Sequence, residues 1–239
     1  MTASRGDTVH PCPAEVVAVR HGQSAANVAF AEAEATGRDV DLAGRDADVE
    51  LSPAGRAQSA ALGGWLAALP PARFPHVTYC SPYLRARQTW DLAAEHAAAA
   101  GRPACPTRVD ERLRDREMGH LELLTPATIA RRFPEEARRR ERLGDFYHRP
   151  PGGESLADVA ARLRTFLADL DRVEPGRRVL LITHDAVVLM LRYVTEQLDE
   201  AELTELMLAG SVRNAAVNRW EATTGRLRLA EFNATGHLP

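Results

Sequence analysis

The chain has 239 residues, of which 45% are hydrophobic and 5% aromatic. That length predicts one large domain whose core consists mainly of Leu, Val and Ala. The formal net charge of −3 provides no overall basic field, so no specific nucleic-acid partner is expected. No stretch approaches the roughly 18 apolar residues of a membrane helix, and the N-terminus has no secretory signal pattern. The protein is therefore expected to be soluble and cytoplasmic, with no membrane partner.

The chain contains no lysine, so all 30 of its basic residues are arginine. This excludes Walker-type phosphate loops, kinase-type ATP sites and Schiff-base chemistry, each of which needs a lysine amine. The arginine side chain that remains is permanently charged and can bind phosphate with two parallel hydrogen bonds. Cys12, Cys80 and Cys105 follow no metal-ligand spacing and are interpreted as free thiols of a reducing compartment.

In chain order, residues 1–13 predict a flexible leader, and the apolar run Val16-Val17-Ala18-Val19 predicts a buried strand over 15–19. Residues 25–50 show no strong period and are interpreted as a loop or loosely helical excursion. The later elements are a helix from Ser52-Pro53 to Pro70-Pro71, a strand at 76–80, a helix at 83–100 begun by Ser81-Pro82, a helix at 154–173 with a Ser155–Asp158 capping box, a strand at 178–183, a helix at 186–197, and strands at 214–220 and 227–232. Strands followed by helices predict an α/β fold with a parallel sheet.

Two histidines stand at the ends of predicted strands: His21 follows the strand at 15–19 and His184 follows the strand at 178–183. A parallel sheet brings both imidazoles to one edge, where open α/β sheets place ligands. Arg20 and Arg85 can join them there, and such a group suits a phosphate dianion. His21 would attack as a neutral imidazole whose pKa the neighbouring cations lower, while His184 would donate to the phosphoryl oxygens.

The segment Arg20-His21-Gly22-Gln23-Ser24, with Asn27, resembles the signature of the histidine phosphatase superfamily, the phosphoglycerate mutase-like proteins. The resemblance covers most of the chain from Val16 to about Val217 and includes Leu51-Ser52-Pro53-Ala54-Gly55 with Gln58, Ser81-Pro82 with Arg85-Ala86-Arg87-Gln88-Thr89, Gly153-Glu154-Ser155, and Thr183-His184. It implies a three-layer α/β/α sandwich with a mostly parallel central sheet. A single domain over residues 14–239, with lid insertions at about 25–50 and 120–150, is expected.

This resemblance also implies roles for individual residues. His21 is the phosphohistidine nucleophile and His184 is the second histidine of the pocket. The phosphate ligands are Arg20 and Arg85, joined by two further residues of the signature, Ser24 and Asn27. Neither a metal ion nor a cofactor is implied.

The general acid is the point at which the sequence departs from the family pattern, which often has a glutamate four residues before a glycine. Aligned on Gly119, that position holds Asp115, and Glu117 lies two residues nearer the glycine. The acid must carry a proton for the leaving alkoxide, which requires a pKa raised by burial. Asp115 is the first candidate and Glu117 the second. Asp185 is the third, because another branch of the superfamily uses a His-Asp pair, although a role at a helix N-terminus is preferred for it.

An arginine-rich stretch lies between the acid segment and Gly153, comprising Arg131-Arg132 and the run Arg138-Arg139-Arg140-Glu141-Arg142. Glu135 with Arg139, and Glu136 with Arg140, have i,i+4 spacing, which favours a solvated helix face over a substrate lid that holds a second anion. The role of Arg131 and Arg132 stays open.

The leading prediction of function is a metal-independent phosphomonoesterase that acts on a small phosphorylated metabolite through a phosphohistidine. A phosphoglycerate mutase-type phosphotransferase is the nearest alternative, and the absence of lysine weighs against it because mutases of this family use a lysine around the substrate. The alternative from another class is a catalytically weak sensor of a phosphate ligand. The presence of a general acid would favour an enzyme over such a sensor. The expected partner is the small phosphorylated substrate. The oligomeric state is open, a homodimer included.

Overall fold

The computed structural model describes residues 12–239. The predicted leader therefore lies outside the described residues except for its last two. Of these, Cys12 accepts a hydrogen bond from the backbone N–H of Gly176 at 2.9 Å through its carbonyl oxygen. No helix in residues 12–239 has both the length and the apolar character needed to cross a bilayer.

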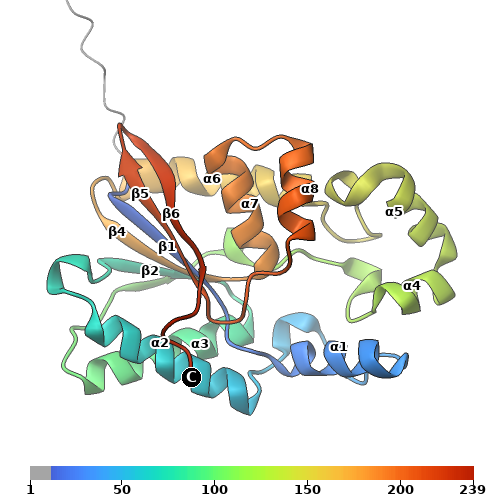
Figure 1. The fold of residues 1–239 in the computed structure, drawn as a ribbon, viewed down its shortest axis with the longest axis horizontal. Coiled ribbons are helices and arrows are strands. Elements are labelled where there is room, and N and C mark those ends of the chain that lie inside the picture. The colour runs from blue at the N-terminus through green and yellow to red at the C-terminus, as the bar shows by residue number, and fades with distance from the viewer. Residues whose placement is uncertain (1–11) are drawn as a thin grey trace, which may run out of the picture.

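The centre of the fold is one six-stranded sheet in the order β3-β2-β4-β1-β5-β6 (Figure 1). Its strands are β1 (Glu15–Arg20), β2 (Val77–Cys80), β3 (Thr107–Val109), β4 (Arg178–Thr183), β5 (Val217–Thr223) and β6 (Arg226–Ala234). The four strands β3, β2, β4 and β1 are parallel, and β5 and β6 continue the sheet antiparallel. Because β1 and β4 are buried on both faces, they consist of continuous apolar runs.

Helices cover both faces of this sheet (Figure 1). The helices of the described residues are α1 (Ala25–Thr36), α2 (Pro53–Ala68), α3 (Leu84–Ala99), α4 (Pro126–Arg132), α5 (Pro134–Tyr147), α6 (Leu156–Val173), α7 (Asp185–Glu196) and α8 (Glu200–Leu208), with short 3₁₀ turns η1 (Asp46–Asp48), η2 (Pro71–Arg73), η3 (Glu111–Leu113) and η4 (Gly119–Leu121). Helices α2 and α3 pack on one face of the sheet, and α6 and α7 pack on the other. The predicted three-layer sandwich with a mostly parallel sheet is confirmed.

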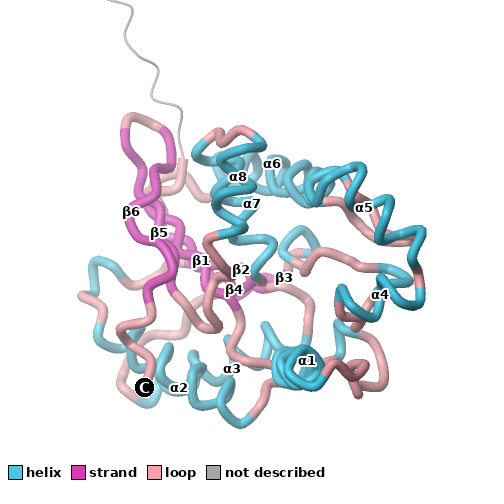
Figure 2. The backbone as a smooth tube through the Cα atoms, turned by 45° about the vertical axis from the view of Figure 1, so that its right-hand side comes forward, coloured by secondary structure: helices cyan, strands magenta, loops and turns pink. Residues whose placement is uncertain are grey.

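The two predicted insertions lie to one side of the sheet. Figure 2 shows α1, α4 and α5 standing apart from the strands. The excursion at 25–50 is more regular than predicted, because its first half is the twelve-residue helix α1. A capping box between Ser24 and Asn27 starts this helix, and Gly37, with a φ of 69°, ends it. The sequence pattern left open whether this segment is a loop or loosely helical, because most side chains of α1 are small or exposed.

The predicted strands and most predicted helices are confirmed within a few residues of their bounds, including the capping box of α6 at Ser155 and Asp158. One capping assignment was wrong. The N-cap residue of α3 is Tyr83, whose side chain makes no capping hydrogen bond. Ser81 is occupied instead by a buried contact with His184, because its hydroxyl lies 2.7 Å from the Nε2 atom of that histidine.

Gly55 lets the start of α2 touch the loop that follows β1. A Cβ atom at Gly55 would lie 1.9 Å from the carbonyl oxygen of Gln23. We expect Gly55→Ala to lower the free energy of unfolding by on the order of 3 kcal/mol, because backbone must move to relieve the clash. Gly64, in the same helix, has nothing within 4 Å of such an atom. Gly64→Ala is the matched control and should raise stability by roughly 1 kcal/mol in urea unfolding.

Candidate active site

Strand pairing places the two predicted histidines side by side. Arg20 is opposite Thr183 in the parallel register of β1 and β4, so the next residue of each chain segment emerges at the same edge. The backbone N–H of His21 donates to the carbonyl oxygen of Thr183 at 2.8 Å. The rings of His21 and His184 have centroids 5.0 Å apart, and both side chains are buried. The sheet therefore brings together residues 163 positions apart in the sequence.

Hydrogen bonds define which nitrogen of His21 is free to react. Nδ1 lies 2.7 Å from the carbonyl oxygen of Gly22, which can only accept, so Nδ1 carries the proton. Nε2 then holds the lone pair and accepts a hydrogen bond from Arg85 Nε at 3.1 Å. Burial, followed by the charges of Arg85, His184 and Arg20, holds the pKa of His21 well below its usual range. His21 is therefore a neutral imidazole whose Nε2 lone pair faces the cations.

His184 is oriented by Ser81. The hydroxyl of Ser81 accepts the backbone N–H of Tyr83 at 3.2 Å and lies 2.7 Å from Nε2 of His184. A proton on Nδ1 fits both neighbours, because the Ser81 hydroxyl can donate to Nε2 and the carboxylate of Asp115 near Nδ1 can accept. Within residues 12–239 that Nδ1 atom is buried without a hydrogen bond, 3.4 Å from Asp115 Oδ2. Burial and then Arg85 and Arg20 lower the pKa of His184, so it is a neutral donor with an open position.

The two predicted phosphate-binding arginines differ in their surroundings. Arg20 donates through Nη1 to the carbonyl oxygen of Val212, and its Nε is buried with no partner in the described chain. Arg85 is only 3% exposed and binds His21, Asp115 and Asp46 together. Both guanidinium groups line the same cavity as His21.

The three candidate acids all line this cavity but differ in their contacts. Asp115 Oδ2 lies 3.0 Å from Arg85 Nη2, and Asp115 Oδ1 accepts the N–H of Arg116 at 2.9 Å. The side chain of Glu117 is 46% exposed and lies 3.4 Å from Arg114.

Asp185 is the first residue of α7, where it accepts the backbone N–H of Val212 at 2.9 Å, and burial raises its pKa. Asp115 is thus the candidate that contacts both the arginine and the second histidine.

Arg162 of α6 fixes the backbone that carries Asp115. Its guanidinium donates to the carbonyl oxygens of Arg112, Arg114 and Asp115 at 2.5, 3.0 and 3.1 Å. Its charge is balanced by Glu154 at 3.1 Å. No pattern in the sequence singled out Arg162, because its partners are backbone atoms of a segment about fifty residues earlier.

Ser24 and Asn27 both line the cavity and are also hydrogen-bonded to each other. The Ser24 hydroxyl and backbone N–H both donate to Asn27 Oδ1, at 3.1 and 3.0 Å. Asn214 also donates to Asn27 Oδ1, and to the carbonyl oxygen of His21, each at 3.1 Å. Asn27 Oδ1 therefore accepts hydrogen bonds from both Ser24 and Asn214.

The cavity has a volume of about 480 Å³ and is lined mostly by polar residues. Sequence reasoning missed several of its residues, and two of them contact the predicted site residues directly. Tyr83 packs edge-on against His184, with centroids 5.0 Å apart, and lies under the guanidinium of Arg85 at 4.9 Å. Asp46, in η1, binds Arg85 through both carboxylate oxygens. Tyr83 follows the Ser81-Pro82 motif, which offered a signal, whereas nothing in the segment around Asp46 offered one.

The family model of the histidine phosphatase superfamily, branch 1, matches residues 16–235. The chain belongs to this superfamily. It is 35% identical to the 2,3-bisphosphoglycerate-dependent phosphoglycerate mutase 2 of Gloeobacter violaceus over 195 aligned residues. The alignment covers 79% of this chain and 80% of the mutase. This histidine phosphatase is therefore an enzyme of the phosphatase and phosphotransferase class.

Solved structures of mycobacterial proteins have the same fold. A mycobacterial glucosyl-3-phosphoglycerate phosphatase is similar with a TM-score of 0.70 and 31% identity, covering 92% of this histidine phosphatase and 99% of that chain. A protein described as mycobacterial hydrolase 1 is similar with a TM-score of 0.72 and 30% identity, covering 93% and 99% of the two chains.

The arginine-rich stretch of this histidine phosphatase lies on two surface helices, α4 and α5, as the preferred interpretation expects, but its predicted i,i+4 pairs are wrong. Arg138 pairs with Glu135 and Arg139 with Glu136, three residues apart, and Arg140 pairs with Asp145. The i,i+3 spacing is equally close on a helix surface.

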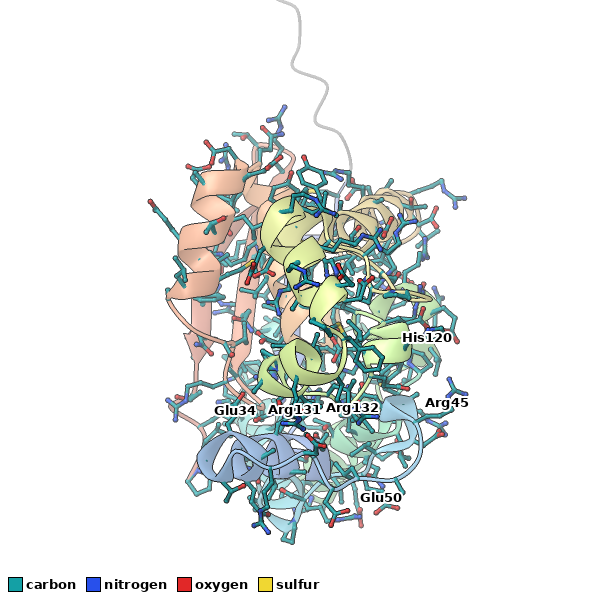
Figure 3. All side chains as sticks on the ribbon, turned by 90° about the vertical axis from the view of Figure 1, so that its right-hand side faces the viewer. Glu34, Arg45, Glu50, His120, Arg131 and Arg132 are labelled. Carbon is teal, nitrogen blue, oxygen red and sulfur yellow. The ribbon has the colours of Figure 1, made fainter. Side chains whose placement is uncertain are left out.

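The segments at 25–50 and 120–150 are joined near Asp39. Arg131 of α4 pairs with Asp39 of the 25–50 excursion, and Thr128 donates to the same carboxylate at 2.6 Å. Figure 3 shows Arg131 and Arg132 beside α1, which carries Glu34, with Arg45 and His120 on the same side of the molecule. Asp39 therefore connects the 25–50 segment to α4 through Arg131 and Thr128.

The two buried histidines of the cavity, His21 and His184, predict that this histidine phosphatase loses stability as the pH falls. Their pKa values lie well below the usual 6.5, so the folded state stays unprotonated while the unfolded chain binds protons. The free energy of unfolding should fall below about pH 6.5, by about 1.4 kcal/mol per pH unit for each histidine. Urea unfolding between pH 5 and 8 measures the slope. His184→Asn should make the slope shallower by up to about 1.4 kcal/mol per pH unit, whereas His96→Asn, at an exposed position of α3, should leave it unchanged.

Proposed function

We propose that this enzyme is a metal-independent phosphomonoesterase that hydrolyses a small phosphorylated metabolite through a phosphohistidine at His21. The observation that carries the proposal is the state of His21: Nδ1 is bound to the carbonyl of Gly22, so Nε2 presents its lone pair among Arg20, Arg85 and His184. A neutral nucleophile surrounded by phosphate-binding cations is the arrangement that phosphoryl transfer to nitrogen requires.

The proposed reaction has two displacements. In the first, His21 Nε2 attacks phosphorus, the bond from phosphorus to the ester oxygen breaks, and the departing alkoxide takes a proton from Asp115. In the second, a water molecule gives a proton to the Asp115 carboxylate and attacks the phosphohistidine, which releases inorganic phosphate and restores His21. His184, with its proton on Nδ1, donates to the phosphoryl oxygens as negative charge develops on them.

The cavity supports a small substrate rather than a macromolecule. Its volume of about 480 Å³ falls in the range of small-molecule pockets. Phe30, Met118 and Leu123 give its wall an apolar part, and the exposed Arg45 lies at its edge. These features fit a phosphate ester whose alcohol part has both apolar and polar groups.

A phosphoglycerate mutase is the second candidate, and the 35% identity to the Gloeobacter mutase favours it. The lysine-free composition weighs against it. The likeness to glucosyl-3-phosphoglycerate phosphatase, which spans nearly the full length of both chains, weighs toward hydrolysis. A catalytically weak phosphate sensor is opposed by the presence of Asp115 beside Arg85 and His184.

Release of inorganic phosphate from p-nitrophenyl phosphate and a panel of metabolite phosphates, with EDTA present, tests the proposal. Turnover that survives EDTA, with an acid-labile and alkali-stable phosphoryl group trapped on the protein by rapid quenching, is the expected result. Interconversion of phosphoglycerates without phosphate release would identify a mutase. Phosphate binding without turnover of any ester would identify a sensor.

A further inference from the structure

Every N–H group of Arg85 is already bound by an acceptor of the protein. Nε donates to His21 Nε2 at 3.1 Å, and Nη2 donates to Asp46 Oδ2 and Asp115 Oδ2 at 2.8 and 3.0 Å. Nη1 donates to the carbonyl oxygen and to Oδ1 of Asp46 at 2.5 and 3.0 Å. A guanidinium has five N–H donors, so none is left for a phosphoryl oxygen. A phosphate can reach Arg85 only by replacing one of these acceptors.

Asp46 is the acceptor that a phosphate would replace. Its two carboxylate oxygens lie on Nη1 and Nη2 in parallel, which is the fork that arginine also offers to phosphate. Asp115 contributes a single oxygen, and His21 contributes the reacting nitrogen. The carboxylate of Asp46 thus occupies the bidentate face of Arg85.

The position of Asp46 is built into the fold. Asp46 begins the 3₁₀ turn η1, and its backbone N–H donates to Glu122 Oε1 at 2.8 Å, which ties the 25–50 excursion to the segment after η4. Its side chain is 23% exposed, so it lies at the inner wall of the cavity with an outlet toward solvent. A rotation of this one side chain would open Arg85 while the turn stays in place.

We propose that Asp46 is an internal anion that competes with the phosphoryl group for Arg85 and so weakens the binding of every phosphate ligand, the product of the proposed reaction included. The proposal rests on the proposed function of the site. The contact between Asp46 and Arg85 must break before a phosphate can bind Arg85. The apparent affinity of every phosphate ligand is therefore its intrinsic affinity multiplied by the fraction of molecules in which Arg85 is free of Asp46. Free phosphate bears the same cost as an ester, so the competition does not change the ratio of their affinities. Asp46 therefore weakens the binding of product phosphate and of every phosphate ester, and a cognate ester offsets this cost through contacts of its alcohol part.

Calorimetric titration of the whole protein with inorganic phosphate and with orthovanadate tests this role. Asp46→Asn keeps the shape of the side chain but replaces one acceptor oxygen with an NH₂ group, which removes the bidentate contact. Both anions should bind about tenfold more tightly, or more. Asp48→Asn is the matched control, because Asp48 is an exposed carboxylate of the same turn and does not line the cavity. The Asp48→Asn variant should bind both anions with the affinity of the native protein.

Asp46→Ala is the second variant, because it removes the carboxylate without introducing a new donor. Tighter anion binding in both Asp46 variants supports the proposal, and equal or weaker binding in both, with circular dichroism like that of the native protein, overturns it. The binding readout is independent of turnover. If no ester is hydrolysed but the anions bind more tightly, the proposed function fails and the competition stands; if esters are hydrolysed and anion affinity is unchanged, the competition fails alone.

Discussion

His21→Ala is expected to abolish phosphate release, with kcat lower by about 10⁴-fold or more, because it removes the imidazole whose unprotonated Nε2 faces Arg85 in the described site. The variant should retain its fold, since the ring of His21 contacts the open cavity as well as His184. It should also still bind orthovanadate through Arg20 and Arg85. Initial rates of phosphate release and calorimetric binding measure the two effects.

His96→Ala is the control for His21→Ala, because His96 is exposed on α3 and does not line the cavity. Native turnover is expected for it. If the His21 variant kept its turnover and a trapped phosphoryl group appeared on His184, the assignment of the nucleophile would have to be exchanged between the two histidines.

Asp115→Asn is expected to lower kcat by on the order of 10²- to 10³-fold for esters of ordinary alcohols, whose alkoxides need a proton in order to leave. Esters with a good leaving group, such as p-nitrophenyl phosphate, should be affected much less in the first displacement. The amide oxygen can still accept the hydrogen bond of Arg85, so KM should change little. The dependence of kcat on the leaving group is therefore the measurement that identifies the acid.

Glu117→Gln and Asp185→Asn complete this comparison. Glu117 is partly exposed and paired with Arg114, and Asp185 accepts a backbone N–H of Val212, so neither change should produce a dependence on the leaving group. A steep dependence in the Asp185 variant, and none in the Asp115 variant, would assign the proton donor to α7. Burial raises the pKa of Asp185, and a raised pKa is what a carboxyl group needs in order to hold a proton for donation.

Local patterns were sufficient where a segment is determined by its own residues. The apolar runs before His21 and His184 correspond to β1 and β4, and the capping box at Ser155 starts α6. The excursion at 25–50 was less predictable, since α1 has only two buried residues and its sequence carries little periodic signal. The i,i+3 ion pairs of α5 were mistaken for i,i+4 pairs because sequence spacing does not reveal side-chain rotamers.

The sequence by itself determined the nature of the site: two histidines behind buried strands, an arginine beside the first and another in the first turn of a helix. These features are local, because strand ends and helix starts are encoded by neighbouring residues. Only the tertiary structure decided which carboxylates meet those groups. Asp46 and Asp115 come from irregular segments that are positioned by long-range contacts with Glu122 and Arg162. No periodicity encodes such contacts, and they decide that Arg85 is already bound by carboxylates before a phosphate arrives.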